Sequence, residues 1–349
     1  MARKKGKKLI LLAGIMFGIT AISTLITYGV NAPKKHEDTT SNGASNNKPG
    51  EKIQNIVTSF YPMYIAALNL TEGVEGITVE NLMSQQVGCP HDYQLTTNDM
   101  KKLEHADMLI INGGDMESYV EEVVSRYNDL VIVDSSENIS LLEGEEHTHE
   151  KEDMDHTHEE DVDHSHDEDT DHDTEGHDHG AYNGHIWMDP TRYILQLENI
   201  TRKLIANDSA HEEQYEENLK AYKQRIMKVW RQYEELGTSS QSQVIIFHDA
   251  MEYILNCLGI EVAYSIDIDG ETSLSAGEIA EVIEEIKRHK IQVLFIEAQF
   301  DTNIANRIAE ETGAKVYVLD TMVSGVMTKD AYINSLISNL SVLKEALYQ

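Results

Sequence analysis

Short apolar runs alternate with helix-length segments over most of this chain. In its first part, β-branched runs at 53–59, 108–111 and 130–133 are separated by segments with helical signals at 63–72 and 97–106. Parallel strands need a long crossover connection, which a helix usually provides. The pattern therefore predicts an α/β lobe with a mainly parallel sheet.

The same order repeats in the C-terminal third of the chain. Strands are predicted at 244–247, 262–266, 293–296 and 316–319, with helices up to residue 258, at 275–289, at 302–312 and at the C-terminus. Ser275 and Glu278 have the spacing of a capping box, which marks the start of one of these helices. In open parallel sheets, ligands bind beyond the carboxyl ends of the strands, so functional residues are expected there.

A long amphipathic helix is predicted at 211–236, between the two alternating parts. Its apolar residues recur at offsets of three and four and form one face: Tyr215, Leu219, Tyr222, Ile226, Trp230 and Tyr233. At about 1.5 Å per residue, this helix would be about 39 Å long. We predict two α/β lobes, 51–207 and 237–349, each with a mainly parallel four-stranded sheet flanked by helices. A spine helix at 208–236 would join them, with the ligand in the cleft between them.

The N-terminus departs from this pattern. A basic start, MARKKGKK, precedes the apolar run 9–30, and a polar stretch follows up to residue 50. An apolar run of this length serves as a signal peptide or as a membrane-spanning helix. Basic residues stay on the cytoplasmic side, which leaves the rest of the chain outside. Residues 1–50 are therefore predicted to be a signal or anchor with a polar tether, and the protein to be extracytoplasmic, at the cell surface or secreted.

The acidic charge of the chain is unevenly distributed. The formal net charge is −33, and residues 143–180 hold eighteen Asp and Glu, nine His and one Lys. This segment lacks the apolar residues needed for a core and is predicted to be a disordered loop of the first lobe. Its repeated His-x-His pairs favour a weak zinc collector over a plain acidic linker. No basic stripe is present, so nucleic acid is excluded as a partner, and membrane contact is expected only through the N-terminal segment.

Two candidate ligands follow predicted strands, and two lie in loops. His248 follows 244–247 in FHDA, and Asp320 has the equivalent place after 316–319 in VLDT. His91, in GCPHDY, and His185, in GHIWMDP, belong to the first lobe. If they converge across a cleft, they supply three neutral nitrogens and one carboxylate, a set that suits tetrahedral zinc. Spacing alone leaves a structural role open for each of them.

Several motifs of this sequence resemble the metal-specific solute-binding proteins of bacterial ABC transporters, and in particular their zinc-binding branch. They are CPHDYQLTTND, ADMLIINGGDME, NGHIWMDP, FHDAMEYI, VLFIEAQFD and VYVLD, and the likeness runs over about residues 53–349. The resemblance implies that His91, His185 and His248 bind Zn²⁺, with Asp320 at a position where relatives place a carboxylate. Some zinc-binding members complete the site with water or another side chain instead.

The resemblance also implies a transport role. The chain would capture Zn²⁺ outside the membrane and deliver it to an ABC permease that works with a separate ATPase subunit, and we expect it to be a monomer and not an enzyme. Manganese-binding relatives have a carboxylate at the position of His248, and a third imidazole favours zinc over manganese. The chain departs from the family by having no lipid-attachment Cys after the apolar run.

The alternatives are a manganese-binding homologue, a surface metal buffer or adhesin with the same fold, and a secreted zinc hydrolase. The hydrolase is disfavoured because neither His158 nor His211 begins an HExxH motif. Three carboxylates near the candidate ligands have open roles. Asp189 and Asp249 either orient ligand histidines or cap helices, and Glu297 could be a hydrogen-bonding partner in the cleft.

Overall fold

The computed structural model describes residues 54–83, 90–144, 182–236, 243–266, 274–298 and 302–348. The predicted export segment and the acidic tract from residue 145 onward lie outside these residues. Within the described residues, none of the helices combines the length and the apolar character that a membrane span requires. All the elements below belong to one unit, residues 47–349.

The first sheet has four parallel strands in the order β2-β1-β3-β4. They are β1 (Asn55–Thr58), β2 (Thr78–Asn81), β3 (Met108–Ile111) and β4 (Val131–Asp134). All four residues of β3 are buried, as expected of a central parallel strand that is covered on both faces. Edge strand β2, with the sequence TVEN, alternates between exposed and half-buried residues. It has no apolar run, which is why the hydrophobic pattern did not reveal it.

The second sheet repeats this architecture with the order β10-β9-β7-β8. Its strands, all parallel, are β7 (Gln243–Ile246), β8 (Glu261–Ser265), β9 (Val293–Glu297) and β10 (Lys315–Leu319). Each is followed by a helix, in turn α7 (Glu252–Cys257), α8 (Ala276–His289), α9 (Thr302–Thr312) and α10 (Ala331–Leu347). Ser275 and Glu278 form the predicted capping box at the start of α8. The predicted fold class, two parallel four-stranded sheets flanked by helices, is confirmed.

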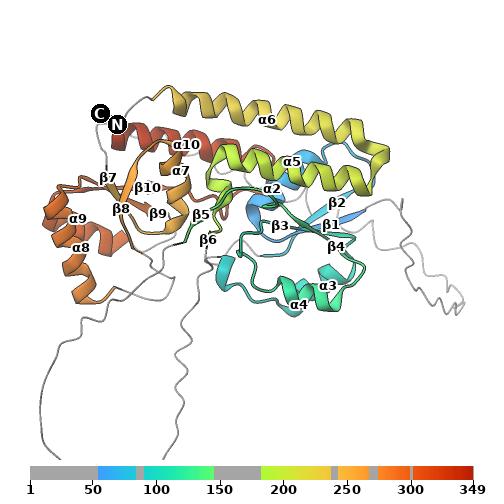
Figure 1. The fold of residues 1–349 in the computed structure, drawn as a ribbon, viewed down its shortest axis with the longest axis horizontal. Coiled ribbons are helices and arrows are strands. Elements are labelled where there is room, and N and C mark those ends of the chain that lie inside the picture. Colours follow the sequence, from blue (N-terminus) through green and yellow to red (C-terminus); the bar gives the residue numbers. More distant parts are fainter. Residues whose placement is uncertain are drawn as a thin grey trace, which may run out of the picture. The chain divides into compact units, whose positions relative to one another are not determined.

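Three of the remaining helices, α2 (Tyr61–Leu70), α3 (Thr97–Glu104) and α4 (Val120–Arg126), follow strands of the first sheet. Helices α5 (Pro190–Asn207) and α6 (Glu212–Glu234) lead from the first sheet to the second. Helix α6, the predicted spine, contacts α5, α2 and α10, and Figure 1 shows α6 extending past both sheets, with α10 beside the part of α6 nearer the second sheet. The predicted lobe boundaries stay a prediction, because one continuous cluster of buried apolar residues includes members from both sheets.

Aromatic side chains fill the region where the two sheets meet. The rings of Tyr193 and Tyr332 stack with centroids 4.1 Å apart, and Trp187 meets Phe60 edge to face at 5.0 Å. Their polar atoms bond across the same region: Trp187 Nε1 donates to the carbonyl of Thr321, and the Tyr332 hydroxyl donates to the carbonyl of Trp187. Because buried aromatic rings have large areas and specific geometry, this seam strongly opposes sliding of one half over the other.

The segment after β10 crosses back to the first sheet and depends on a glycine. The Tyr61 hydroxyl donates to the carbonyl of Val326 over 2.8 Å. Beside it, Gly325 has φ +151°, and a Cβ on Gly325 would lie 2.7 Å from that hydroxyl oxygen. A larger residue would therefore combine backbone strain with a clash.

We expect Gly325→Ala to lower the free energy of unfolding by about 1–3 kcal/mol, because strain and overpacking act at the same position. The matched control is Gly277→Ala in α8, where the added Cβ would have only an ordinary contact at 3.7 Å with Ser275 Oγ. Alanine favours a helix over glycine, so this control should be neutral or stabilising. Urea unfolding of both variants is the measurement, and equal stability of the two would contradict the prediction.

Candidate metal centre

Three of the four predicted ligands lie together beyond the carboxyl ends of the strands. His91 belongs to the short 3-10 helix η1 (Pro90–Asp92), His185 precedes η2 (Ile186–Met188), and His248 follows β7. The ring centroids are 5.3 Å apart for His91 and His185 and 4.8 Å apart for His185 and His248. Histidines from both halves of the chain therefore form one cluster, with His185 in the middle.

The His185 loop is fixed to the end of β3. Asn112, directly after that strand, donates from Nδ2 to the carbonyl of Gly184 over 2.8 Å. A Cβ on Gly184 would lie only 2.8 Å from the carbonyl oxygen of Gly114, so the close approach of the two segments requires glycine. This packing places His185 in a site where its side chain is fully buried.

Of the two ring nitrogens of His185, only Nδ1 has polar partners among the described residues. Nδ1 lies 3.0 Å from Asn183 Oδ1 and 3.3 Å from Asp249 Oδ1. Nε2 is buried and has no hydrogen-bond partner among the described residues. A buried polar atom left in this way costs about 1–3 kcal/mol, so it calls for a ligand to explain it.

His248 is oriented by the neighbouring strand. Strands β7 and β9 pair with Ile246 opposite Phe295, so two residues further on His248 comes beside Glu297. The distance from His248 Nδ1 to Glu297 Oε1 is 2.6 Å, and both residues are buried. A carboxylate on one imidazole nitrogen fixes the ring and makes the other nitrogen more basic, an arrangement common around metal ions. Glu297 thus lies within ion-pair distance of His248, next to the histidine cluster.

The carboxylate nearest the histidines is Asp249. Its Oδ1 lies 3.3 Å from His185 Nδ1 and 3.5 Å from His248 Nε2. Potential ligand atoms of these three residues lie within 4.8 Å of one another. Asp189, the other flanking carboxylate, instead caps α5 by accepting from the backbone N–H groups of Thr191 and Arg192. Asp189 therefore has the helix-capping role considered for it, whereas Asp249 lies beside the histidines.

Asp320 lies apart from that group of three. It follows β10, and β9 separates β10 from β7 in the sheet order, so Asp320 and His248 leave strands roughly 9–10 Å apart. Its Oδ1 accepts from the backbone N–H of Met322, and its Oδ2 accepts from Ser335 Oγ over 2.5 Å. Both carboxylate oxygens thus have local donors.

Burial determines the charge of the central histidine. Desolvation lowers the pKa of His185 well below its usual value, and the neighbouring His248 and His91 lower it further. The imidazole is therefore neutral near pH 7, which is the form that binds metal ions.

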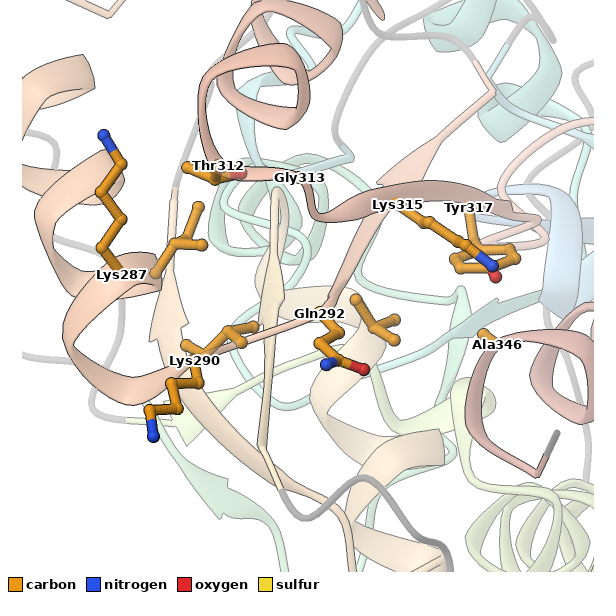
Figure 2. A pocket seen from close by; sticks show the side chains of 11 residues that line it. Lys287, Lys290, Gln292, Thr312, Gly313, Lys315, Tyr317 and Ala346 are labelled. Atoms are coloured by element: carbon orange, nitrogen blue, oxygen red, sulfur yellow. The ribbon is translucent and has the colours of Figure 1, made fainter.

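A separate pocket of about 610 Å³ lies at the opposite ends of strands β9 and β10. Figure 2 shows Lys287, Lys290 and Lys315 around it, and none of its lining residues is a His, Cys, Asp or Glu. Because protein ligands of zinc are Cys, His, Asp and Glu side chains, this pocket does not compete with the histidine cluster as a zinc site.

The chain matches known proteins over most of its length. Residues 56–346 match the sequence model of the family described as zinc-uptake complex component A, periplasmic. The chain is 27% identical over 313 residues to the zinc-binding lipoprotein AdcA of Streptococcus pneumoniae, covering 87% of this chain but 58% of that protein. It is 27% identical over 318 residues to the high-affinity zinc uptake system protein ZnuA of Bacillus subtilis, covering 89% of this chain and 92% of that protein.

Solved structures show the same fold. The Zn(II)-bound ZnuA-like domain of Streptococcus pneumoniae AdcA aligns with a TM-score of 0.66 at 23% identity, covering 86% of this chain and all of that domain. At this identity the likeness concerns the fold alone. The roles of individual residues have to be argued from their own geometry.

The depressed pKa of His185 predicts how the metal-free protein responds to acid. In the unfolded chain this imidazole takes up a proton near pH 6.5, whereas burial keeps it neutral in the folded state. Below about pH 6.5 the unfolded state binds more protons, so this group should remove up to about 1.4 kcal/mol of stability per pH unit. Urea unfolding between pH 7.5 and 5.5 measures the loss.

The variant His185→Gln should make that loss smaller because it removes the titrating group. His105→Gln, at an exposed position, is the matched control and should leave the slope unchanged. A His185→Gln slope as steep as that of the unmodified protein would refute the expectation.

Proposed function

The chain belongs to the zinc-uptake complex component A family, and from this membership and the histidine cluster we propose that it captures Zn²⁺ outside the cytoplasm and delivers it to an ABC permease. ATP hydrolysis would take place on a separate subunit. In this proposal the protein is a monomeric binding protein without catalytic activity, and the zinc ion is its cargo.

The observation that carries the proposal is the buried Nε2 of His185, which has no protein partner among the described residues and lies between two other imidazoles. The other ring nitrogen already has oxygen partners. A bound cation would remove the cost of the unpartnered atom without moving the ring. Since His185 is neutral near pH 7, the cation would displace no proton from it.

The donor set supports zinc over manganese. Three imidazoles, those of His91, His185 and His248, suit zinc, whereas manganese is better served by carboxylate and water oxygens. The alternative of a manganese carrier would need more oxygen donors than the one or two carboxylates near the cluster.

A carboxylate is proposed as the fourth ligand. The family pattern favours Asp320. Asp249 is the nearer carboxylate, because its Oδ1 lies 3.5 Å from His248 Nε2, but its neighbour on His185 is Nδ1, at 3.3 Å, and not the unpartnered Nε2. For Asp320 to bind the ion, its carboxylate would have to exchange the bonds from Ser335 and Met322 for the metal.

We also propose that the chain works on the outer side of the membrane, attached through residues 1–50 or released from them. One similar protein is described as a lipoprotein, and the family description is periplasmic. The basic and apolar N-terminus of this chain supports the same placement.

Replacing any of His91, His185 or His248 with Ala should weaken zinc binding more than about 100-fold, because losing a ligand costs more than the roughly 10–100-fold typical of its hydrogen-bonding partners. Competition titration of the full chain against a chelating dye measures the affinity, with Mn²⁺ titrated in parallel. The control is His289→Ala, at an exposed position near the end of α8. Unchanged tight binding in all three variants would refute the proposal, and tighter binding of Mn²⁺ than of Zn²⁺ would refute the choice of metal.

The fourth ligand can be identified with a pair of isosteric variants, Asp249→Asn and Asp320→Asn. We expect the variant that removes the true ligand to lose about tenfold or more in zinc affinity, and the other to lose much less. X-ray absorption at the zinc edge counts oxygen and nitrogen neighbours in each variant. Full affinity in both would exclude a carboxylate ligand at either position.

A further inference from the structure

Asn183 is a buried residue at the junction of three parts of the molecule. It ends β6 (Tyr182–Asn183), a two-residue strand that pairs antiparallel with β5 (Leu142–Glu143). Its exposed fraction is 2%, and it lies two residues before His185. The sequence motif NGHIWMDP contains it, but nothing in the residue spacing indicated a role.

The orientation of the Asn183 amide follows from its neighbours. The backbone N–H of His185, which can only donate, points to Asn183 Oδ1 at 3.0 Å. On the other side, Nδ2 donates to the carbonyl of Asp249 and to Glu252 Oε2, each over 3.0 Å. Reversing the amide would face donor with donor and acceptor with acceptor, so only one orientation is compatible with these partners.

This orientation determines which nitrogen of His185 carries the proton. The same Oδ1 lies 3.0 Å from His185 Nδ1, and an amide oxygen can only accept. Nδ1 must therefore carry the proton. In a neutral imidazole that leaves the lone pair on Nε2, which is the buried nitrogen that has no partner in the described part of the chain.

The other end of the amide connects His185 to the second half of the chain. Asp249 and Glu252 belong to the turn that begins at His248, and the Tyr253 hydroxyl donates to the carbonyl of Asn183 over 2.7 Å. One side chain thus contacts the His185 loop and the segment that carries His248. Removing it would free the two histidines to change their separation.

We propose that Asn183 is a positioning residue for metal capture: it sets the tautomer of His185 and fixes the distance between His185 and His248. This inference rests on the proposed function, because it assumes that these histidines bind the ion. Hydrogen-bonding partners of metal ligands typically contribute about 10–100-fold to affinity. The amide of Asn183 uses both of its donors and its oxygen, so none of its bonding capacity is left for another role.

The first test is Asn183→Ala in the full chain, with Asn199→Ala as the matched control. Asn199 is also buried, and its Nδ2 donates to the carbonyls of Ser135 and Glu137, away from the histidines. Both variants lose a buried amide and should lose comparable stability. Only Asn183→Ala should weaken zinc binding about 10–100-fold.

The tautomer gives a readout that needs no metal. Nitrogen NMR of the metal-free protein labelled with ¹⁵N-histidine, assigned by comparison with His185→Gln, should show His185 protonated at Nδ1. Asn183→Ala leaves only the more distant Asp249 Oδ1, at 3.3 Å, as an acceptor for this proton, so it should shift the population toward protonation at Nε2, and Asn199→Ala should not. Zinc affinity within about threefold of the unmodified protein, or an unchanged tautomer in Asn183→Ala, would overturn the inference.

A second variant separates the two roles. Asn183→Asp keeps an acceptor for His185 but places an oxygen against the carbonyl of Asp249 and the carboxylate of Glu252, so the tautomer should persist while affinity falls. Adding Glu252→Gln supplies a donor to the new carboxylate and should restore at least half of the lost affinity on a logarithmic scale. Absence of this rescue would overturn the distance-fixing role.

The same measurements distinguish failure of this inference from failure of the proposed function. If His185→Ala retains full zinc affinity, the proposed function fails, whatever Asn183 does. If His185→Ala abolishes binding while Asn183→Ala changes neither affinity nor tautomer, only the role of Asn183 is overturned.

Discussion

The central constraint of this molecule is a neutral imidazole buried where only one of its two nitrogens has a partner. His185 lies at the join between the two sheets, and Asn183 and Asp249 surround Nδ1 while Nε2 is left without one among the described residues. In water the ring would form hydrogen bonds through both nitrogens. Burying one of them without a partner therefore costs free energy on folding. In the proposed function, a bound zinc ion would offset this cost.

The rest of the fold keeps that arrangement in place. The aromatic seam of Trp187, Tyr193 and Tyr332 joins the two sheets, and helix α6 extends past both while contacting α2 and α10. The ligand histidines therefore approach from opposite halves of a continuous core. A site assembled in this way requires little ordering when the ion arrives, because its geometry exists beforehand.

The charge of the whole chain and the charge of the histidine cluster differ. The chain carries a formal net charge of −33, which attracts cations in general, but the cluster itself is built mainly from imidazole rings. Carboxylates at its border, Glu297 and Asp249, orient the rings or stand beside them. Selectivity then depends on nitrogen donors in fixed positions, and accumulation depends on the acidic surroundings.

The sequence alone determined the fold class and singled out three histidines that the structure brings together. Buried strands show as apolar runs, and a residue directly after a parallel strand must lie at the ligand-binding edge, so His248 could be placed from its position. Strand β2 was not predicted because an edge strand needs no apolar run. Asp320 and Asp249 could not be ranked as candidates for the fourth ligand, because the local sequence does not determine the order of strands in the sheet. Only the tertiary structure placed Glu297 beside His248, because these residues are far apart along the chain. It also placed Asn183 between the two halves, where a single side-chain amide contacts both the His185 loop and the segment after His248.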